Sequence, residues 1–229
     1  KMQLKQLRLP VLLESWDMVI KEATEKSPSY GIFLKEILAS ESTRRTQRAK
    51  QLRAQKAKIP DQYEITTYPF QQQPKLNRKQ VLEIYDSTDY IVKPQNIALI
   101  GPTGVGKTGL AISYLNHAIE SGQNGRFILF SDLIVELYQS VADGSTSKVL
   151  RKFTEYGCLV IDEMGYVEID NQAQAGLLFK LLRGRKKCTI ITSNLGFDEW
   201  QKFLKNENLT AALLDKFTAH CHLINMLQC

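Results

Sequence analysis

The chain has 229 residues, of which 43% are hydrophobic and 24% charged, and its formal net charge is +6. This composition is typical of a globular protein and excludes a disordered, collagen-like or disulfide-dense chain. No run approaches the roughly 20 apolar residues of a membrane-spanning helix, and charged residues interrupt the first twenty positions as they would not in a signal peptide. The four cysteines lack C-x-x-C spacing, which predicts free thiols in a reducing compartment. We therefore expect a cytoplasmic protein with no membrane partner.

The first sixty residues predict a small helical domain. Apolar residues recur at helical spacing after Pro10, which suits the first turn of a helix, and again from Tyr30 to Leu38. Lys1 ahead of Met2 indicates a processed or engineered start. The second helix runs, without glycine or proline, into a basic segment that ends before Pro60, so it either continues or a third helix begins.

The whole charge surplus lies in that basic segment, residues 41–58. It carries seven basic side chains and a single acid, Glu41, so the rest of the chain is neutral. Spread over a helix these charges cover most faces and repel one another unless an anion lies alongside, and the absence of aromatic residues favours the phosphates of double-stranded DNA over base stacking. A solvated helix with incidental charge is the alternative. The predicted DNA-binding residues are Arg44, Arg45, Arg48, Lys50, Arg53, Lys56 and Lys58.

The remainder, residues 61–229, predicts a second domain of α/β class. A polar connector runs from Asp61 to about Lys75, and Asn77 is expected to cap a helix that completes the lead-in, residues 61–95. Short apolar runs then alternate with helix-length segments, which argues for a parallel sheet covered on both faces. The predicted strands are Ile97–Ile100, Phe127–Phe130, Cys158–Ile161, Thr189–Thr192 and Cys221–Ile224, and the predicted helices include Lys107–Ser121, Asp132–Ala142 and Gln172–Leu182.

A phosphate-binding loop follows the first predicted strand. The sequence GPTGVGKT fits the pattern G-x-x-x-x-G-K-[ST], and a helix is expected to begin at its lysine. Glycines let main-chain N–H groups turn toward phosphates, and the helix N-terminus adds positive potential. Lys107 would contact the β- and γ-phosphates of ATP, and the Thr108 hydroxyl would ligate Mg²⁺. A plain glycine turn is the alternative. The loop comprises Gly101, Pro102, Thr103, Gly104, Val105, Gly106, Lys107 and Thr108.

Two further strand ends carry polar residues suited to ATP hydrolysis. Asp162 would hold Mg²⁺ through water, and Glu163 would act as general base toward the attacking water. Asn194 follows another strand, at the edge where ligands of parallel sheets bind, and would contact the γ-phosphate or the water unless it only caps the next helix. A carboxylate that activates water also argues against a small-molecule kinase.

Together these motifs resemble those of the IstB transposition helper proteins, which are AAA+ ATPases related to the DnaC helicase loaders. The resemblance implies an AAA+ P-loop NTPase with a central parallel sheet, preceded by a small all-helical domain. It spans nearly the whole chain. The segments that carry it, besides the phosphate loop, are LKQLRLP at Leu4–Pro10, IDE-x-G-Y at Ile161–Tyr166, TSNL at Thr192–Leu195, TAALLDK at Thr210–Lys216 and AHCHLI at Ala219–Ile224.

The resemblance implies an ATP-dependent, DNA-binding homo-oligomer that assembles on target DNA, bends it and presents it to an IstA-type transposase, which drives ATP hydrolysis. By the same resemblance the phosphate loop binds ATP, Asp162 and Glu163 serve Mg²⁺ and water, and Asn194 is a sensor. The family usually has arginine where this chain has Lys216, the position of a finger acting on a neighbouring subunit. We therefore predict weak unassisted ATPase activity with ATP binding retained. The chain also ends, at Cys229, earlier than expected for the family.

Several alternatives stay open at this stage. Another arginine could supply the finger, and a second basic cluster before the fourth strand is interpreted as an exposed turn. A DnaC-like helicase loader acting on single-stranded DNA and an ATP-gated DNA scaffold with little turnover are the rival functions. The candidate fingers are Arg151, Arg183 and Arg185, and the second cluster comprises Arg183, Arg185, Lys186 and Lys187.

Overall fold

The computed structural model describes residues 1–93, 95–169 and 172–226, in two compact units, Lys1–Leu52 and Arg53–Cys229. The first unit contains α1 (Met2–Gln6), α2 (Pro10–Lys26) and most of α3 (Tyr30–Ala57). Pro10 occupies the first turn of α2, as the sequence predicts, and α3 continues through the basic segment as one helix. The division between the units falls inside α3, whereas the predicted domain boundary, residue 60, lies beyond the end of this helix.

The second unit is built on a parallel sheet. In the described part of the chain its strands are β1 (Asn96–Ile100), β2 (Gly125–Leu129), β3 (Cys158–Met164), β4 (Cys188–Ser193) and β5 (Cys221–Asn225). They lie in the order β2-β3-β4-β1-β5, and every neighbouring pair is parallel. The predicted α/β class and parallel sheet are therefore confirmed.

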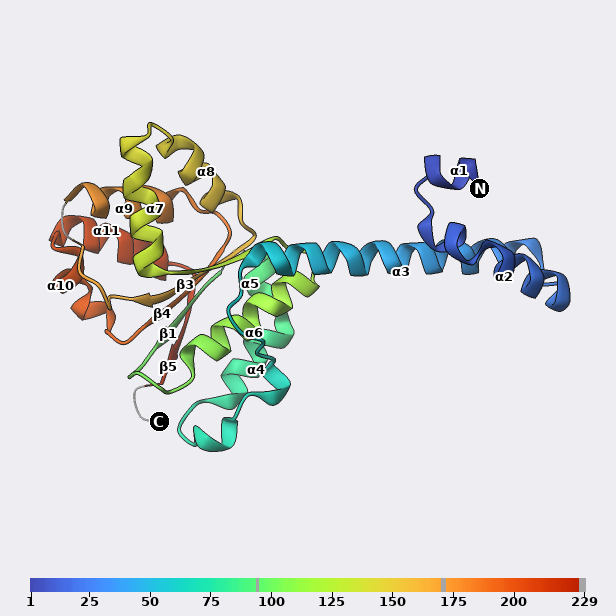
Figure 1. Ribbon diagram of the computed structural model, residues 1–229. Helices are drawn as coiled ribbons and strands as arrows, with labels where there is room; N and C mark the ends of the chain where they lie inside the picture. The colour runs from blue at the N-terminus through green and yellow to red at the C-terminus, as the bar shows by residue number, and fades with distance from the viewer. Residues whose placement is uncertain (94, 170–171, 227–229) are drawn as a thin grey trace. The chain divides into compact units, whose positions relative to one another are not determined.

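Helices cover both faces of this sheet (Figure 1). One face carries α4 (Arg78–Ser87), α5 (Asp89–Val92) and α6 (Lys107–Glu120), and the other carries α7 (Phe130–Ala142), α8 (Thr146–Glu155), α9 (Gln172–Gly184), α10 (Trp200–Leu204) and α11 (Glu207–Thr218). Strand β1 shows why two separate cores form. Ile97 and Leu99 pack in the core that contains α6, whereas Ala98 and Ile100 pack in the other, because successive strand residues point to opposite faces.

Some of the observed helices and strands differ from the predicted ones. Phe130, placed at the end of a strand by its apolar neighbours, begins α7 instead. Helices α8 and α11 are absent from the sequence-based expectations. The predicted helix cap at Asn77 is confirmed, because its side chain accepts a hydrogen bond from the Gln80 N–H at 3.1 Å. Cys158, Cys188 and Cys221 are free thiols, and Cys229 lies outside the described residues. None of the helices within the described ranges is long and apolar enough to cross a membrane.

Candidate active site

The phosphate loop joins the carboxyl end of β1 to the first turn of α6. Gly104 and Gly106 have φ values of 87° and 84°, a left-handed conformation that favours glycine, and Gly106 is the residue that caps α6. The Lys107 ammonium lies 2.7 Å from the carbonyl oxygens of Gly101 and Pro102. The Lys107 side chain therefore folds back onto the first two residues of its own loop, and Lys107 itself begins a 14-residue helix.

The electrostatic surroundings of Lys107 act on its pKa in opposite directions. Partial burial lowers the pKa of the ammonium, and the carboxylates of Asp162 and Glu163 raise it to a smaller extent. The net direction is downward. A phosphate chain in the loop would add negative charge beside the ammonium and so favour its protonated form.

Thr108 and Asp162 bring oxygen ligands together beside the loop. The Thr108 hydroxyl lies 3.0 and 3.1 Å from the two carboxylate oxygens of Asp162, whose side chain is buried at the end of β3. Mg²⁺ prefers oxygen ligands and is usually held by one or two carboxylates together with substrate phosphates and water. These two residues fit that ion. Within residues 1–93, 95–169 and 172–226, no group of three His, Cys, Asp or Glu side chains forms a separate metal site.

Glu163 and Asn194 face the same cavity as the loop. Glu163 is exposed next to Asp162, and its φ of 60° is left-handed, which is strained for a residue with a side chain. Asn194 directly follows β4. Both line a cavity of about 340 Å³ together with Lys107 and Thr108. The structure thus brings together the predicted loop, base and sensor residues, with Asp162 in hydrogen-bond contact with Thr108.

The other wall of this cavity comes from the connector, a segment for which the sequence predicts no role in the site. Tyr63, Tyr68 and Pro69 line it, beside the short 3-10 helices η1 (Ile65–Thr67) and η2 (Phe70–Gln72). The Tyr68 hydroxyl donates to the Val105 carbonyl of the loop at 3.3 Å. The Tyr63 ring covers α6 so closely that a Cβ at Gly109 would lie 3.1 Å from it. The sequence feature that could have indicated this role is the pair of tyrosines in an otherwise Gln-rich segment.

Lys216 lies away from this cavity. It lines a second cavity, of about 320 Å³, together with Asn96 and Thr189, which stand near the amino ends of β1 and β4. Because the phosphate loop follows the carboxyl end of β1, Lys216 sits at the opposite end of the sheet from the loop of its own chain. Arg183, Lys186 and Lys187 also line this second cavity, and Lys216 is exposed there.

One of the candidate fingers is excluded by burial. Arg185, expected in an exposed turn, is 5% exposed, and its guanidinium donates to the Phe153, Tyr156 and Cys188 carbonyls and to the Thr189 hydroxyl. Burial lowers its pKa to about 10. Arg185 therefore holds α8 against the start of β4. It is available neither to a neighbouring nucleotide nor to DNA.

Arg183 and Arg151, the other candidate fingers, stay exposed. Arg183 lies over the Phe179 ring, 5.8 Å from its centroid. Arg151 pairs with Glu155 at 2.6 Å on the same helix. Neither residue lines the cavity that contains the phosphate loop.

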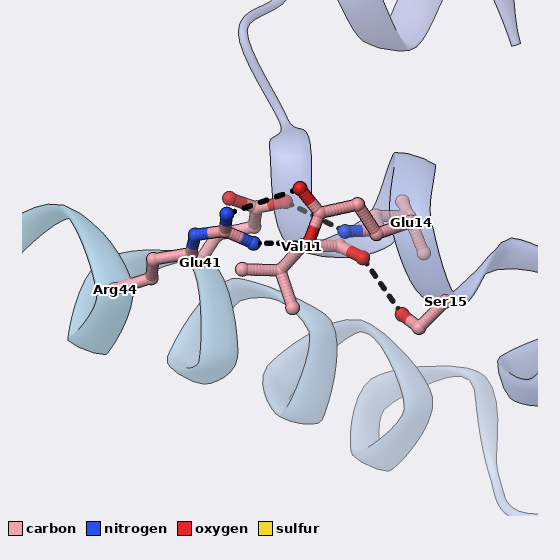
Figure 2. A network of polar contacts seen from close by, with 6 residues as sticks. Val11, Glu14, Ser15, Glu41 and Arg44 are labelled. Atoms are coloured by element: carbon pink, nitrogen blue, oxygen red, sulfur yellow. Dashed lines mark hydrogen bonds and ion pairs between the residues drawn. The ribbon is translucent and has the colours of Figure 1, made fainter.

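In the first unit, the basic segment is not free of partners. The Arg44 guanidinium donates to both carboxylate oxygens of Glu14 on α2, one of them at 3.0 Å (Figure 2). This bond lowers the pKa of Glu14 and raises that of Arg44. The expectation of uncompensated charge is therefore wrong at Arg44, because a partner thirty residues earlier in the chain is invisible to local pattern. Arg45 and Arg48 are exposed.

The last part of the basic segment belongs to the second unit. Ala57, at the end of α3, is fully buried in the core on the α6 side of the sheet. Arg53 is half-buried and its Nε has no hydrogen-bond partner among the described residues, whereas Lys56 and Lys58 are exposed. Lys50 is exposed in the first unit. The predicted DNA-binding set is thus divided between the units.

The strand order and the phosphate-loop cavity define the class of fold: this chain has the fold of an AAA+ P-loop protein. In fold it is similar to the DnaC helicase loader, with a TM-score of 0.55 and 19% identity over 74% of this chain and 96% of that one. It is also similar to AMPPCP-bound DnaA from Aquifex aeolicus, with a TM-score of 0.58 and 15% identity over 74% of this chain and 51% of that one.

The chain belongs to the IstB-like ATP-binding protein family, whose pattern matches residues 2–228. It is 33% identical over 222 residues to the insertion sequence IS5376 ATP-binding protein of Geobacillus stearothermophilus, covering 96% of this chain and 88% of that protein. It is 30% identical over 225 residues to the insertion sequence IS21 ATP-binding protein of Pseudomonas aeruginosa, covering 97% and 84%. The resemblance inferred from the motifs is confirmed, and membership implies nucleotide binding.

Proposed function

We propose that this chain is an ATP-hydrolysing transposition helper that oligomerises on target DNA and remodels it for an IstA-type transposase. The observation that carries the enzymatic part is the cavity in which Lys107, Thr108, Glu163 and Asn194 meet. The relatives from insertion sequences support the transposition part. The exposed arginines of α3 support the DNA-binding part.

Each residue of the cavity has a distinct task in this proposal. Lys107 and the loop N–H groups bind the β- and γ-phosphates, and Thr108 with Asp162 holds Mg²⁺. Mg²⁺, when bound, neutralises the charge that develops on the phosphate oxygens. Glu163 accepts the proton of the attacking water, and the Asn194 amide orients that water or the γ-phosphate. Tyr63 and Tyr68 close the side of the cavity that the connector forms.

ATP hydrolysis is tested by separating binding from turnover. Glu163→Gln keeps the shape of the side chain and removes the base, so we expect ATP affinity to remain and kcat to fall about 10²–10⁴-fold. Lys107→Ala removes the phosphate contact, so affinity itself should fall. Lys79→Ala, on the exposed face of α4, is the matched lysine control. Wild-type turnover in Glu163→Gln would contradict the proposal.

DNA binding is tested by reversing charges that the structure leaves exposed. The double variant Arg45→Glu/Arg48→Glu should weaken binding to duplex DNA and flatten its dependence on salt, because each lost phosphate contact removes about 0.9 from the log–log slope. Lys186→Glu/Lys187→Glu, an equal charge change on the second basic cluster, is the control. Equal losses in both variants would count against the α3 site.

Two rival functions make different predictions in the same assays. A helicase loader would prefer single-stranded over duplex DNA, and the similarity to DnaC in fold is the observation that favours it. A scaffold with little turnover is favoured by Lys216, since lysine lacks the planar fork of an arginine finger. Steady-state ATPase rates with and without transposase and DNA separate the scaffold from the helper. We expect a weak basal rate that rises with the partner.

A further inference from the structure

Strand β3 departs from regular pairing where its two acids stand. The register pairs Ile161 with Ile191 and then Met164 with Ser193, so Asp162 and Glu163 on β3 face only Thr192 on β4. Two residues opposite one is a β-bulge, a feature that redirects side chains and is common beside active sites. At this bulge the main-chain N–H of Glu163 donates its hydrogen bond to the side chain of Thr192.

The Thr192 hydroxyl connects both acids. It accepts a hydrogen bond from the Glu163 N–H at 2.9 Å and lies 2.5 Å from Oδ1 of Asp162. An N–H group can only donate, so the hydroxyl proton is directed to the carboxylate. Thr192 and Asp162 are 1% and 2% exposed, which removes competition from bulk water. The same carboxylate also accepts from Thr108.

We propose that Thr192 is a positioning residue that sets the orientation of the Asp162 carboxylate toward Mg²⁺ and fixes the left-handed backbone of Glu163. This role rests on the proposed ATPase function and deepens it. At this strand end the sequence predicts a role only for Asn194. Thr192 would act indirectly, through the Asp162 carboxylate that would hold the ion and through the main chain of Glu163, the proposed base.

The chemistry requires a hydroxyl at this position. Valine has the shape of threonine but can neither donate to Asp162 nor accept from Glu163, so both groups would lose a partner in a largely dry environment. Serine keeps both hydrogen bonds and lacks only the γ-methyl group. Groups that orient metal ligands in this way typically contribute 10–100-fold to metal affinity.

The experiment measures equilibrium binding as well as turnover. Binding of a fluorescent ATP analogue is titrated with Mg²⁺ for wild type, Thr192→Val and Thr192→Ser, and kcat is measured in parallel. For Thr192→Val we expect the half-saturating Mg²⁺ concentration to rise about tenfold, with affinity for the metal-free nucleotide unchanged and a lower kcat. Thr192→Ser should stay within about twofold of wild type.

The controls separate this inference from the proposed function. If wild type and Lys107→Ala bind the analogue equally, the nucleotide site itself is wrong, whatever Thr192 does. If wild type binds with a Mg²⁺ requirement that Thr192→Val leaves unchanged, the positioning role is overturned. Should Thr192→Val fail to fold in a thermal melt, Thr192→Ala is measured instead, with the same rise expected and the same unchanged value decisive against the role.

Discussion

The carboxylate of Glu41 on α3 accepts a hydrogen bond of 2.8 Å from the main-chain N–H of Leu12 in the first turn of α2. Helix N-terminal N–H groups lack partners within their own helix, and the partial positive charge there favours a carboxylate. Glu41, 5% exposed, thus acts as a cap supplied by a neighbouring helix (Figure 2). The single acid of the basic segment is a packing element of the first unit.

Removing this cap should loosen α2 at its start. We expect Glu41→Ala to accelerate hydrogen exchange of the Leu12 amide about tenfold, because a buried N–H without its partner costs on the order of 1–3 kcal/mol. Glu41→Gln keeps an acceptor oxygen and should have a smaller effect. Glu36→Ala, an exposed position on α3, is the control. Unchanged exchange in Glu41→Ala would show that the contact contributes nothing.

Arg44 and Arg48 should contribute unequally to DNA binding. Arg44 is already compensated by Glu14, whereas Arg48 is exposed, so Arg48→Gln should reduce the salt slope by about 0.9 and Arg44→Gln by clearly less. Glu14→Gln should release Arg44 and make binding tighter and more dependent on salt. Fluorescence anisotropy with a labelled duplex over a salt series measures all three. Equal slopes for the two arginine variants would contradict this assignment.

Arg185 should matter for stability and not for DNA. Arg185→Met removes the guanidinium donor from the carbonyls of Phe153, Tyr156 and Cys188, so we expect a loss of about 3 kcal/mol or more in the free energy of unfolding. Arg183→Met, an exposed position in the last turn of α9, should change it by less than about 0.5 kcal/mol. Urea titration followed by circular dichroism compares the two. If Arg185→Met kept its stability but lost DNA binding, the assignment of Arg185 to stability would be wrong.

A finger acting between subunits can be detected by mixing two inactive variants. Lys216→Ala retains its own Glu163, and Glu163→Gln retains its own Lys216, which lies at the other end of the sheet. If Lys216 completes the site of a neighbour, the mixture should recover a fraction of the ATPase rate that neither variant shows alone. Lys216→Arg should exceed wild type. Wild-type activity of Lys216→Ala measured alone would remove Lys216 from the reaction.

His117 predicts a loss of stability in mild acid. Burial lowers its pKa, partly opposed by Glu120 and Asp86, while its ring stacks on Tyr85 with centroids 4.0 Å apart. A lowered folded-state pKa means that the unfolded chain binds the proton more readily, so stability should fall as the pH drops below the unfolded value of about 6.5. The free energy of unfolding should fall less steeply from pH 7.5 to 5.5 in His117→Gln, measured in urea. Parallel slopes would exclude this contribution.

Local patterns were sufficient to predict which residues of the candidate nucleotide site lie together, because each of its parts follows directly from neighbouring residues. The loop, the strand ending in Asp162 and the polar end of β4 must meet, since parallel strands place their carboxyl ends at one edge of a sheet. The same reasoning placed the Asn77 cap. Apolar periodicity also located all five described strands within a few residues of their observed bounds.

Contacts between distant segments were beyond such reasoning. Nothing near Arg44 indicates Glu14, and nothing in the run of cations around Arg185 distinguishes the one that is buried. Tyr68 contacts Val105 across a separation of 37 residues, so the connector's contribution to the cavity depends on the tertiary fold and cannot be predicted from local sequence. Thr192 was counted only as a β-branched strand residue, because a bulge is a property of the pairing and not of either strand.

At Glu163 the left-handed backbone lowers stability, while the side chain is the one proposed to act as the base. An L-residue pays about 1–2 kcal/mol for this conformation and glycine does not, so glycine there would relax the end of β3 while deleting the carboxylate. A protein selected only for thermal robustness would thus be drawn away from its proposed base.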